Sequence, residues 1–128
     1  MLDMRQGRLG VVAALATATA CGGGGAGRNV KVFDRQDEIS IEATTTMIGK
    51  SGIEPTQQAF AAEGCTDIDA NSLGTSSWSV HGTCGGHRVT FHFVAKEFGS
   101  NLASVLCPTA MTPDGCKAFT LRVLDRAE

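Results

Sequence analysis

The residues best suited to bind an ion are three histidines around one cysteine, spaced as His81-x2-Cys84-x2-His87-x4-His92. Neutral imidazole and thiolate are side chains that zinc and copper use as ligands. If this stretch folds as a hairpin, strand parity places His81 and His92 on one face with Asp69 beside them, so these three are the candidate ligands. The spacing matches no zinc signature, however, and a solvated sheet face accounts for the same residues. We therefore expect no metal site and no cofactor.

The cysteines indicate cross-links rather than catalysis. The chain has five cysteines, and Cys21 precedes the region with domain-like patterning. In an exported chain the even set that remains is expected to form two disulfides, and four cysteines allow three connectivities. Paired cysteines offer no thiolate nucleophile, and the sequence has no G-x-S-x-G elbow, so we predict that the protein is not an enzyme. The four cysteines are Cys65, Cys84, Cys107 and Cys116.

The first 20 residues have the organisation of a signal peptide. Arg5 and Arg8 precede Leu9–Ala20, a continuous run of apolar and small residues. A charged segment, a short apolar segment and small residues before the cleavage site are typical of secretory signals. The apolar run spans about 18 Å as a helix, which is too short for the ~30 Å core of a bilayer. We predict that residues 1–20 direct export and are removed, which places the cysteines in an oxidising compartment.

The end of this segment, Ala18-Thr19-Ala20-Cys21, resembles the lipobox of bacterial lipoproteins, whose cysteine is acylated and becomes the mature N-terminus. The resemblance implies a lipid on Cys21 that holds the protein to a membrane. The same residues satisfy the A-x-A rule of ordinary secretion, which would leave Cys21 as a free thiol. Gly22–Gly25 follow, and we expect residues 21–28 to be a flexible tether. Because Gly22 stands where aspartate would favour the inner membrane, the resemblance implies the outer membrane, facing the periplasm.

Residues 29–128 are expected to form a single domain. Apolar and polar residues alternate over 30–32 and over 39–43, as they do in half-buried strands. A short helix is predicted next, with Pro55 in its first turn and Gly64 at its end. A helix this short needs a surface to pack on, because its propensity alone would not hold it.

A β-hairpin is predicted around Gly85-Gly86, where apolar and polar residues alternate on both sides. A type I′ turn requires positive φ at both central positions, which glycine adopts readily. With these glycines as the turn, Val80 faces Phe91 and Trp78 faces Phe93, all on one side of the sheet. The register and the alternation therefore agree.

The disulfide pairing follows from the predicted strands. Thr66–Ser72 is predicted to run antiparallel to the hairpin, which would bring Cys65 near Cys84 and favours that pair. Cys107 and Cys116 then pair across a short loop that contains prolines. A bridge over so short a loop stabilises a domain by roughly 2–3 kcal/mol, because it restricts the unfolded chain.

The end of the chain completes the expected fold. Ala118–Leu124 is predicted as a final strand, and Asn101–Leu106 as either a second short helix or a loop. Phe33 and Phe98 are expected in the core rather than in exposed loops. The fold class is predicted as α+β: a small antiparallel β-sheet with one short helix packed across it and two disulfides.

A pattern over residues 61–85 adds a second resemblance. Ala61-Ala62-Glu63-Gly64-Cys65, followed by Trp78-x-Val80-x-Gly82-x-Cys84-Gly85, is similar to short, uncharacterised lipoproteins of high-GC Gram-negative bacteria. In those relatives the second cysteine directly follows the glycine, whereas Thr83 intervenes here. The resemblance implies fold and location only, because the family has no activity to carry over.

Charge and elimination lead to the expected function. A formal net charge of −2 gives no electrostatic reason to bind nucleic acid, so no nucleic-acid partner is expected. We expect a small binding or structural module of the cell envelope, whose partner is an envelope protein or the wall. Two alternatives stay open. A periplasmic inhibitor or immunity protein would present the loop around Met111 to a toxin or hydrolase, and a metal-binding protein would use the histidine face.

Overall fold

The computed structural model describes residues 28–74 and 76–128 and contains six strands, two α-helices and two short 3₁₀-helices over that part of the chain. The signal peptide, Cys21 and all of the predicted tether except Arg28 lie outside the described residues. None of the described helices is long and apolar enough to cross a membrane. In chain order the elements are β1 (Val30–Asp34), β2 (Ile39–Thr45), η4 (Gly49–Gly52), α1 (Ile53–Ala62), β3 (Thr66–Leu73), β4 (Ser77–Cys84), β5 (His87–Val94), β6 (Asn101–Cys107), η5 (Thr109–Met111) and α2 (Pro113–Ala127).

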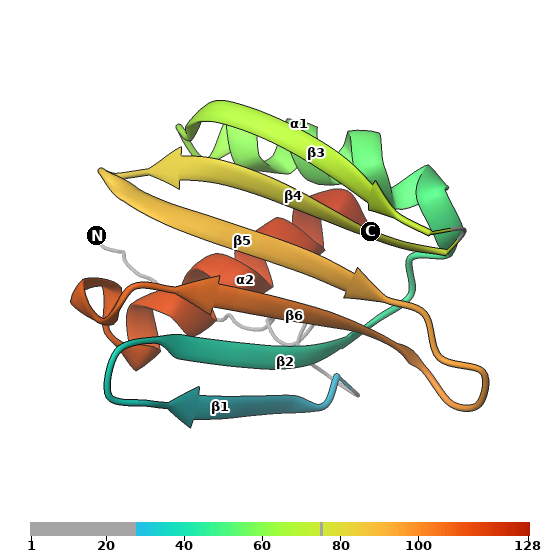
Figure 1. Cartoon of the computed structure of the whole chain (residues 1–128), viewed down its shortest axis with the longest axis horizontal. Helices are drawn as coiled ribbons and strands as arrows, with labels where there is room; N and C mark the ends of the chain where they lie inside the picture. The colour runs from blue at the N-terminus through green and yellow to red at the C-terminus, as the bar shows by residue number, and fades with distance from the viewer. Residues whose placement is uncertain (1–27, 75) are drawn as a thin grey trace, which may run out of the picture.

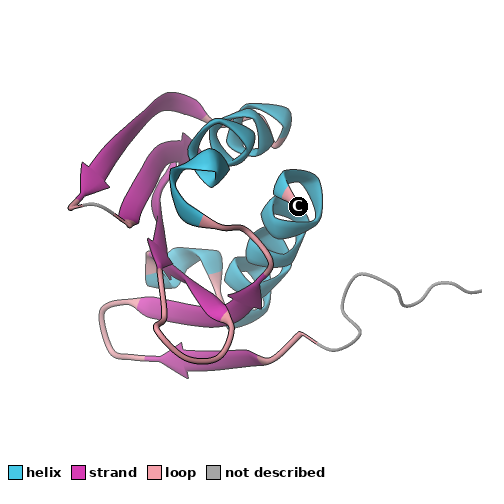
Figure 2. Ribbon diagram, turned by 90° about the vertical axis from the view of Figure 1, so that its right-hand side faces the viewer, coloured by secondary structure: helices cyan, strands magenta, loops and turns pink. Residues whose placement is uncertain are grey.

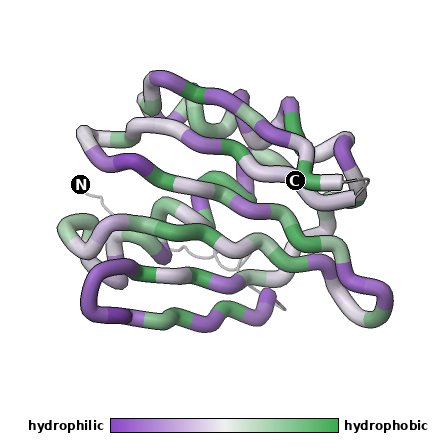
Figure 3. The backbone as a smooth tube through the Cα atoms, in the orientation of Figure 1, coloured by the Kyte–Doolittle hydropathy of each residue, from purple (hydrophilic) through white to green (hydrophobic). Residues whose placement is uncertain are grey.

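The strands form one antiparallel sheet in the order β1-β2-β6-β5-β4-β3. Both helices lie on the same side of it (Figures 1 and 2). The predicted α+β class is confirmed, and the sheet carries two helices where one was expected. Figure 3 shows apolar and polar residues alternating along the strands, which divides the sheet into a face covered by the helices and an open face.

The predicted hairpin is β4 and β5. Its turn residues Gly85-Gly86 have φ of 59° and 83°, a left-handed conformation that costs glycine little. Trp78 pairs with Phe93 and Val80 pairs with Phe91, so the predicted register is confirmed. All four of these side chains are fully buried on the covered face.

An aromatic cluster joins this hairpin to both helices. The Trp78 ring stacks on Phe93, with 5.0 Å between centroids. Phe60 of α1 meets Phe91 edge-on at 6.4 Å and Phe119 of α2 edge-on at 5.4 Å. Stacked and edge-to-face pairs of this kind add about 0.5–1.5 kcal/mol each beyond their burial. The cluster is therefore the centre of the core, and α1 rests on it as the sequence requires of so short a helix.

The close approach of α1 to the sheet depends on Gly82. A Cβ atom at this position would lie 2.7 Å from Cδ2 of Phe60, well inside contact distance. Any larger residue at position 82 would therefore push the Phe60 ring away from the sheet. The glycine creates the space into which Phe60 fits.

The predicted final strand is wrong, because Ala118–Leu124 lies inside α2. Phe119 and Val123 are buried, but so are Cys116, Thr120 and Leu124, which is the spacing of one helical face. Thr112 caps the helix by accepting a hydrogen bond from the Gly115 backbone N–H at 3.1 Å, and Pro113 occupies the first turn. These are standard helix-start signals.

The segment that was expected to be a helix or a loop is also different, because Asn101–Leu106 belongs to β6. Ala103, Val105 and Cys107 are buried, and the residues between them are half-buried. This strand fills the gap between β2 and β5 and makes the sheet continuous. It could not be recognised locally because both of its faces carry apolar residues, Leu102 and Leu106 on one and Ala103 and Val105 on the other, so hydrophobicity does not alternate.

Both predicted disulfides are present. Cys65–Cys84 joins the segment after α1 to the end of β4, and Cys107–Cys116 joins the end of β6 to the first turn of α2. Each bridge therefore fixes one helix to the sheet. All four cysteines are buried, so none of them is a surface thiol.

Removing the second bridge should destabilise the domain measurably. The Cys107→Ala/Cys116→Ala variant is expected to lose about 2–3 kcal/mol of unfolding free energy, because its unfolded chain regains the entropy of an open loop. Urea denaturation of the variant and of the oxidised wild type measures this difference. A reductant should cause a larger decrease in the unfolding free energy of the wild type than of the variant, because the wild type loses two disulfides and the variant loses one. Equal midpoints for the oxidised wild type and the variant would contradict this account.

Candidate functional site

The open face of the sheet is the candidate functional site, and its side chains fall into three rows that cross the strands. The middle row is polar and runs through directly paired positions. The row on one side mixes polar and apolar residues, and the row on the other side is mostly apolar. The middle row comprises Lys31, Glu42, Ser104, His92, Ser79 and Asn71. The mixed row comprises Phe33, Ser40, Leu106, Thr90, His81 and Asp69. The mostly apolar row, called the apolar row below, contains Thr44, Leu102, Val94, Ser77 and Leu73.

Hydrogen bonds connect the two polar-containing rows around His81. Its Nε2 lies 3.1 Å from the Ser79 hydroxyl and 3.4 Å from the Asn71 amide nitrogen. Its Nδ1 lies 3.1 Å from the Thr90 hydroxyl. The imidazole is therefore held by neighbours on three strands, β3, β4 and β5. Such a network fixes the positions of donors and acceptors before any partner arrives.

The candidate metal ligands lie on the face predicted for them but do not converge. Asp69 pairs directly with His81, as expected, but its carboxylate lies 3.3 Å from Arg88 in an ion pair. His92 is in the next row, opposite Ser79. In the described part of the chain, no group of three or more His, Cys, Asp and Glu side chains is placed to hold a metal ion. His81 and His92 thus lie in two adjacent rows of the open face.

Three apolar residues discussed from the sequence have different positions. Phe98 is 82 % exposed, so its predicted core position is wrong. Phe33 is half-buried at the edge of the open face. Met111, the residue that an inhibitor loop would present, packs partly against the core. Hydrophobicity alone could not distinguish these three environments.

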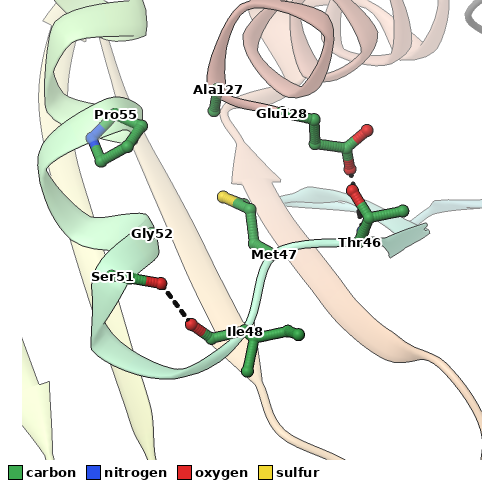
Figure 4. Close-up of a pocket in the computed structure, with 8 residues that line it drawn as sticks. All are labelled: Thr46, Met47, Ile48, Ser51, Gly52, Pro55, Ala127 and Glu128. Atoms are coloured by element: carbon green, nitrogen blue, oxygen red, sulfur yellow. Dashed lines mark hydrogen bonds between the residues drawn. The ribbon is translucent and has the colours of Figure 1, made fainter.

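Pockets of the described residues are open to solvent, and one of them borders the open face near β1. One is lined by Glu63, Met111 and Arg122, among others, beside the first disulfide. Another lies at the β1–β2 edge, around Lys31 and Leu102. A third, of ≈ 280 Å³, lies between the segment after β2, the start of α1 and the end of α2 (Figure 4). None of them gathers the convergent polar groups of a small-molecule site.

A bidentate ion pair, which the sequence did not reveal, joins the first described residue, Arg28, to Glu128 at the C-terminal end of the domain. Arg28, assigned to the tether, donates from Nη1 and Nη2 to the two carboxylate oxygens of Glu128 at 2.9 and 2.8 Å, and from Nη1 to the Thr44 carbonyl at 2.9 Å. Thr45 and the Thr46 backbone N–H also donate to Glu128. Burial opposes ionisation of Glu128, but these donors outweigh it and lower its pKa. The hydrogen bond to Glu128 raises the pKa of Arg28.

A second charged cluster connects the two helices. Glu63, just after α1, accepts hydrogen bonds from Nε of Arg122 at 2.8 Å and Nε of Arg126 at 2.9 Å, both on α2. Its side chain is 8 % exposed. Burial disfavours the charged carboxylate, yet the two arginines outweigh burial and lower the pKa of Glu63. The carboxylate therefore stays ionised where it bridges the helices.

Comparison of the chain with protein families, with curated proteins and with solved structures found no match.

The two carboxylates should make stability depend on pH in the acid range. Because the folded pKa values of Glu63 and Glu128 are lowered, their contribution is present above the ordinary value of 4.5 and is lost as the pH falls below it. We expect the Tm to fall from pH 5 downward. Glu63→Gln should lower the Tm at pH 7, since half-exposed arginines contribute up to about 1 kcal/mol per pair.

A matched variant makes this test specific. Glu97→Gln removes a carboxylate from an exposed loop and should leave the Tm unchanged at pH 7. The difference in Tm between the wild type and Glu63→Gln should shrink as the pH falls below 4.5, because Glu63 of the unfolded wild type then binds a proton that the folded protein binds only at lower pH. A difference that stays constant down to pH 3 would show that the ion pairs do not stabilise the fold.

Proposed function

We propose that the protein is a cell-envelope lipoprotein, held to the membrane by a lipid on Cys21, whose domain binds an envelope protein through the open face of its sheet. Two disulfides support export, because such bonds persist in oxidising compartments. The apolar run over residues 9–20 and the lipobox-like Ala18-Thr19-Ala20-Cys21 support a lipid anchor. The outer membrane, facing the periplasm, is the proposed location.

The observation that carries the binding role is the organisation of the open face. A polar row through the centre of the sheet lies between a mixed row and an apolar row. Antiparallel sheets commonly leave one face in water, but half-buried aliphatic side chains beside ordered hydrogen-bonding groups also provide what a protein interface requires. Leu106 and Leu102 supply the apolar contacts, and Ser104 and His92 supply the polar ones.

A protein partner fits this surface better than a small ligand does. The face is broad and crosses six strands, whereas small-molecule sites are concave and enclose most of their ligand. A macromolecule can cover several rows at once, and its specificity comes from pairing each buried polar group. We propose no catalytic activity and no nucleic-acid partner, in keeping with the sequence.

The anchor is tested by the intact mass of the protein purified from membranes. We expect the chain to begin at Cys21 and to carry diacylglyceryl and, in a host that adds it, a third acyl chain. The full-length Cys21→Ser variant should lose the lipid and leave the membrane fraction. A wild-type mass equal to that of the unmodified chain from Cys21 onward would contradict the anchor and support simple secretion.

The binding face is tested by photo-crosslinking in cells. Benzoylphenylalanine at His92, in the centre of the open face, should yield a discrete crosslinked protein. The same probe at Lys117, exposed on α2, should not. Adding Leu106→Arg to the His92 probe should abolish the adduct, because a charge replaces an apolar contact. The Tm of each variant verifies folding, and equal adducts at His92 and Lys117 would exclude the open face as the binding site.

A further inference from the structure

Exposed apolar side chains gather at one end of the sheet. Ile48, in the segment after β2, is 76 % exposed, Leu73 at the end of β3 is 46 % exposed, and Phe98 between β5 and β6 is 82 % exposed. In an antiparallel sheet of this order these three connections lie at the same end. Figure 1 shows that end on the right, and Figure 2 shows it facing the viewer. We call it the tether end, because the N-terminal segment joins the domain there.

Hydrogen bonds hold the connections of the tether end together. Asn101 donates to the Met47 carbonyl at 3.0 Å and accepts from the Lys96 backbone N–H at 2.9 Å. The Trp78 indole donates to the Gly49 carbonyl at 2.8 Å. The segment carrying Ile48 and the loop carrying Phe98 are therefore fixed to each other and to the core. These two apolar side chains thus belong to a defined surface.

The surface around them is partly apolar. Leu102 and Val94, which pair in the apolar row of the open face, lie next to this end. The ≈ 280 Å³ pocket opens beside Ile48, and its lining combines Met47, Pro55 and Ala127 with the polar residues Thr46, Ser51 and Glu128 (Figure 4). The exposed side chains of Lys50 and Lys96 flank the patch, with Glu97 beside them.

The N-terminal segment enters the domain at this same end. Arg28 is fastened to Glu128 and to the Thr44 carbonyl, and its side chain is 8 % exposed. Arg28 follows Cys21 by seven residues. Seven residues reach at most about 25 Å when fully extended, and a glycine-rich chain of this length averages about 15 Å end to end. A domain of about 100 residues has a radius of gyration of about 13 Å, so its full width, more than twice that radius, exceeds the average reach of the tether.

We propose that the tether end docks on the lipid bilayer, with Phe98, Ile48 and Leu73 entering the boundary between headgroups and acyl chains. The inference rests on the proposed lipid anchor at Cys21, because the short tether keeps this end nearest to the membrane. Aromatic and aliphatic side chains insert to this depth in interfacial proteins. Lys50 and Lys96 then reach the phosphates while their stems stay in contact with apolar surface.

Tryptophan quenching by brominated lipid tests the docking. The lipidated proteins are reconstituted into vesicles of phosphatidylethanolamine and phosphatidylglycerol, with or without dibrominated phosphatidylcholine. Phe98→Trp places a reporter at the tether end, and Gln36→Trp places one in the exposed turn at the opposite end of the sheet. Trp78 is fully buried and its emission in the wild type is subtracted from both. Brominated lipid should quench most of the Phe98→Trp emission and spare the Gln36→Trp emission.

The outcomes separate docking from anchoring. If all variants float with the vesicles and Phe98→Trp is quenched no more than Gln36→Trp, the anchor stands and the docking is wrong. If intact mass shows no lipid and no variant floats, the anchor is wrong, and the docking that depends on it fails too. Ile48→Asp in the Phe98→Trp background should reduce quenching without loss of flotation, because a carboxylate opposes insertion of the same patch.

Discussion

The alternation of side chains in the β4–β5 hairpin is the constraint on which the rest of the structure depends. Trp78 and Val80, paired with Phe93 and Phe91, all point to one side. A slip of one residue would move this whole set into water, so the register of the hairpin is strongly determined. The other strands extend the sheet outward from this hairpin, β3 beside β4 and then β6, β2 and β1 beyond β5. The same parity that builds the core therefore places His92 and its row on the open face.

The helices are stable because this covered face exists. α1 has 10 residues, too few for an isolated helix in water, and Phe60 secures it by filling the space above Gly82. The two disulfides then act where each helix meets the sheet, one after α1 and one at the start of α2. Cross-links at these junctions restrict the unfolded chain and hold the helices in place, which suits a domain of this size.

The sequence determined the parts whose signals are local. The register of the hairpin followed from Gly85-Gly86, and the pairing of Cys65 with Cys84 followed from the antiparallel strand predicted before it. Ala118–Leu124 was wrongly predicted as a strand, because the spacing of Phe119 and Val123 fits both the alternation of a strand and one face of a helix. Contacts between distant residues gave no signal: Arg28 and Glu128 are separated by 100 residues. The polar row of the open face likewise depends on β6, which did not read as a strand because apolar residues occur on both of its faces.

The two proposed contacts are geometrically compatible. The strands run from the tether end to the opposite end, so the open face lies along the side of the domain and does not compete with its end (Figure 1). If Ile48 and Phe98 contact the membrane, Ser104 and His92 on the open face lie exposed to the periplasm, on the side of the domain. The Arg28–Glu128 pair makes this orientation definite, because it fixes where the tether leaves the fold. Anchoring would then restrict the partner search to one plane, which raises the effective concentration of the binding face without any added contact.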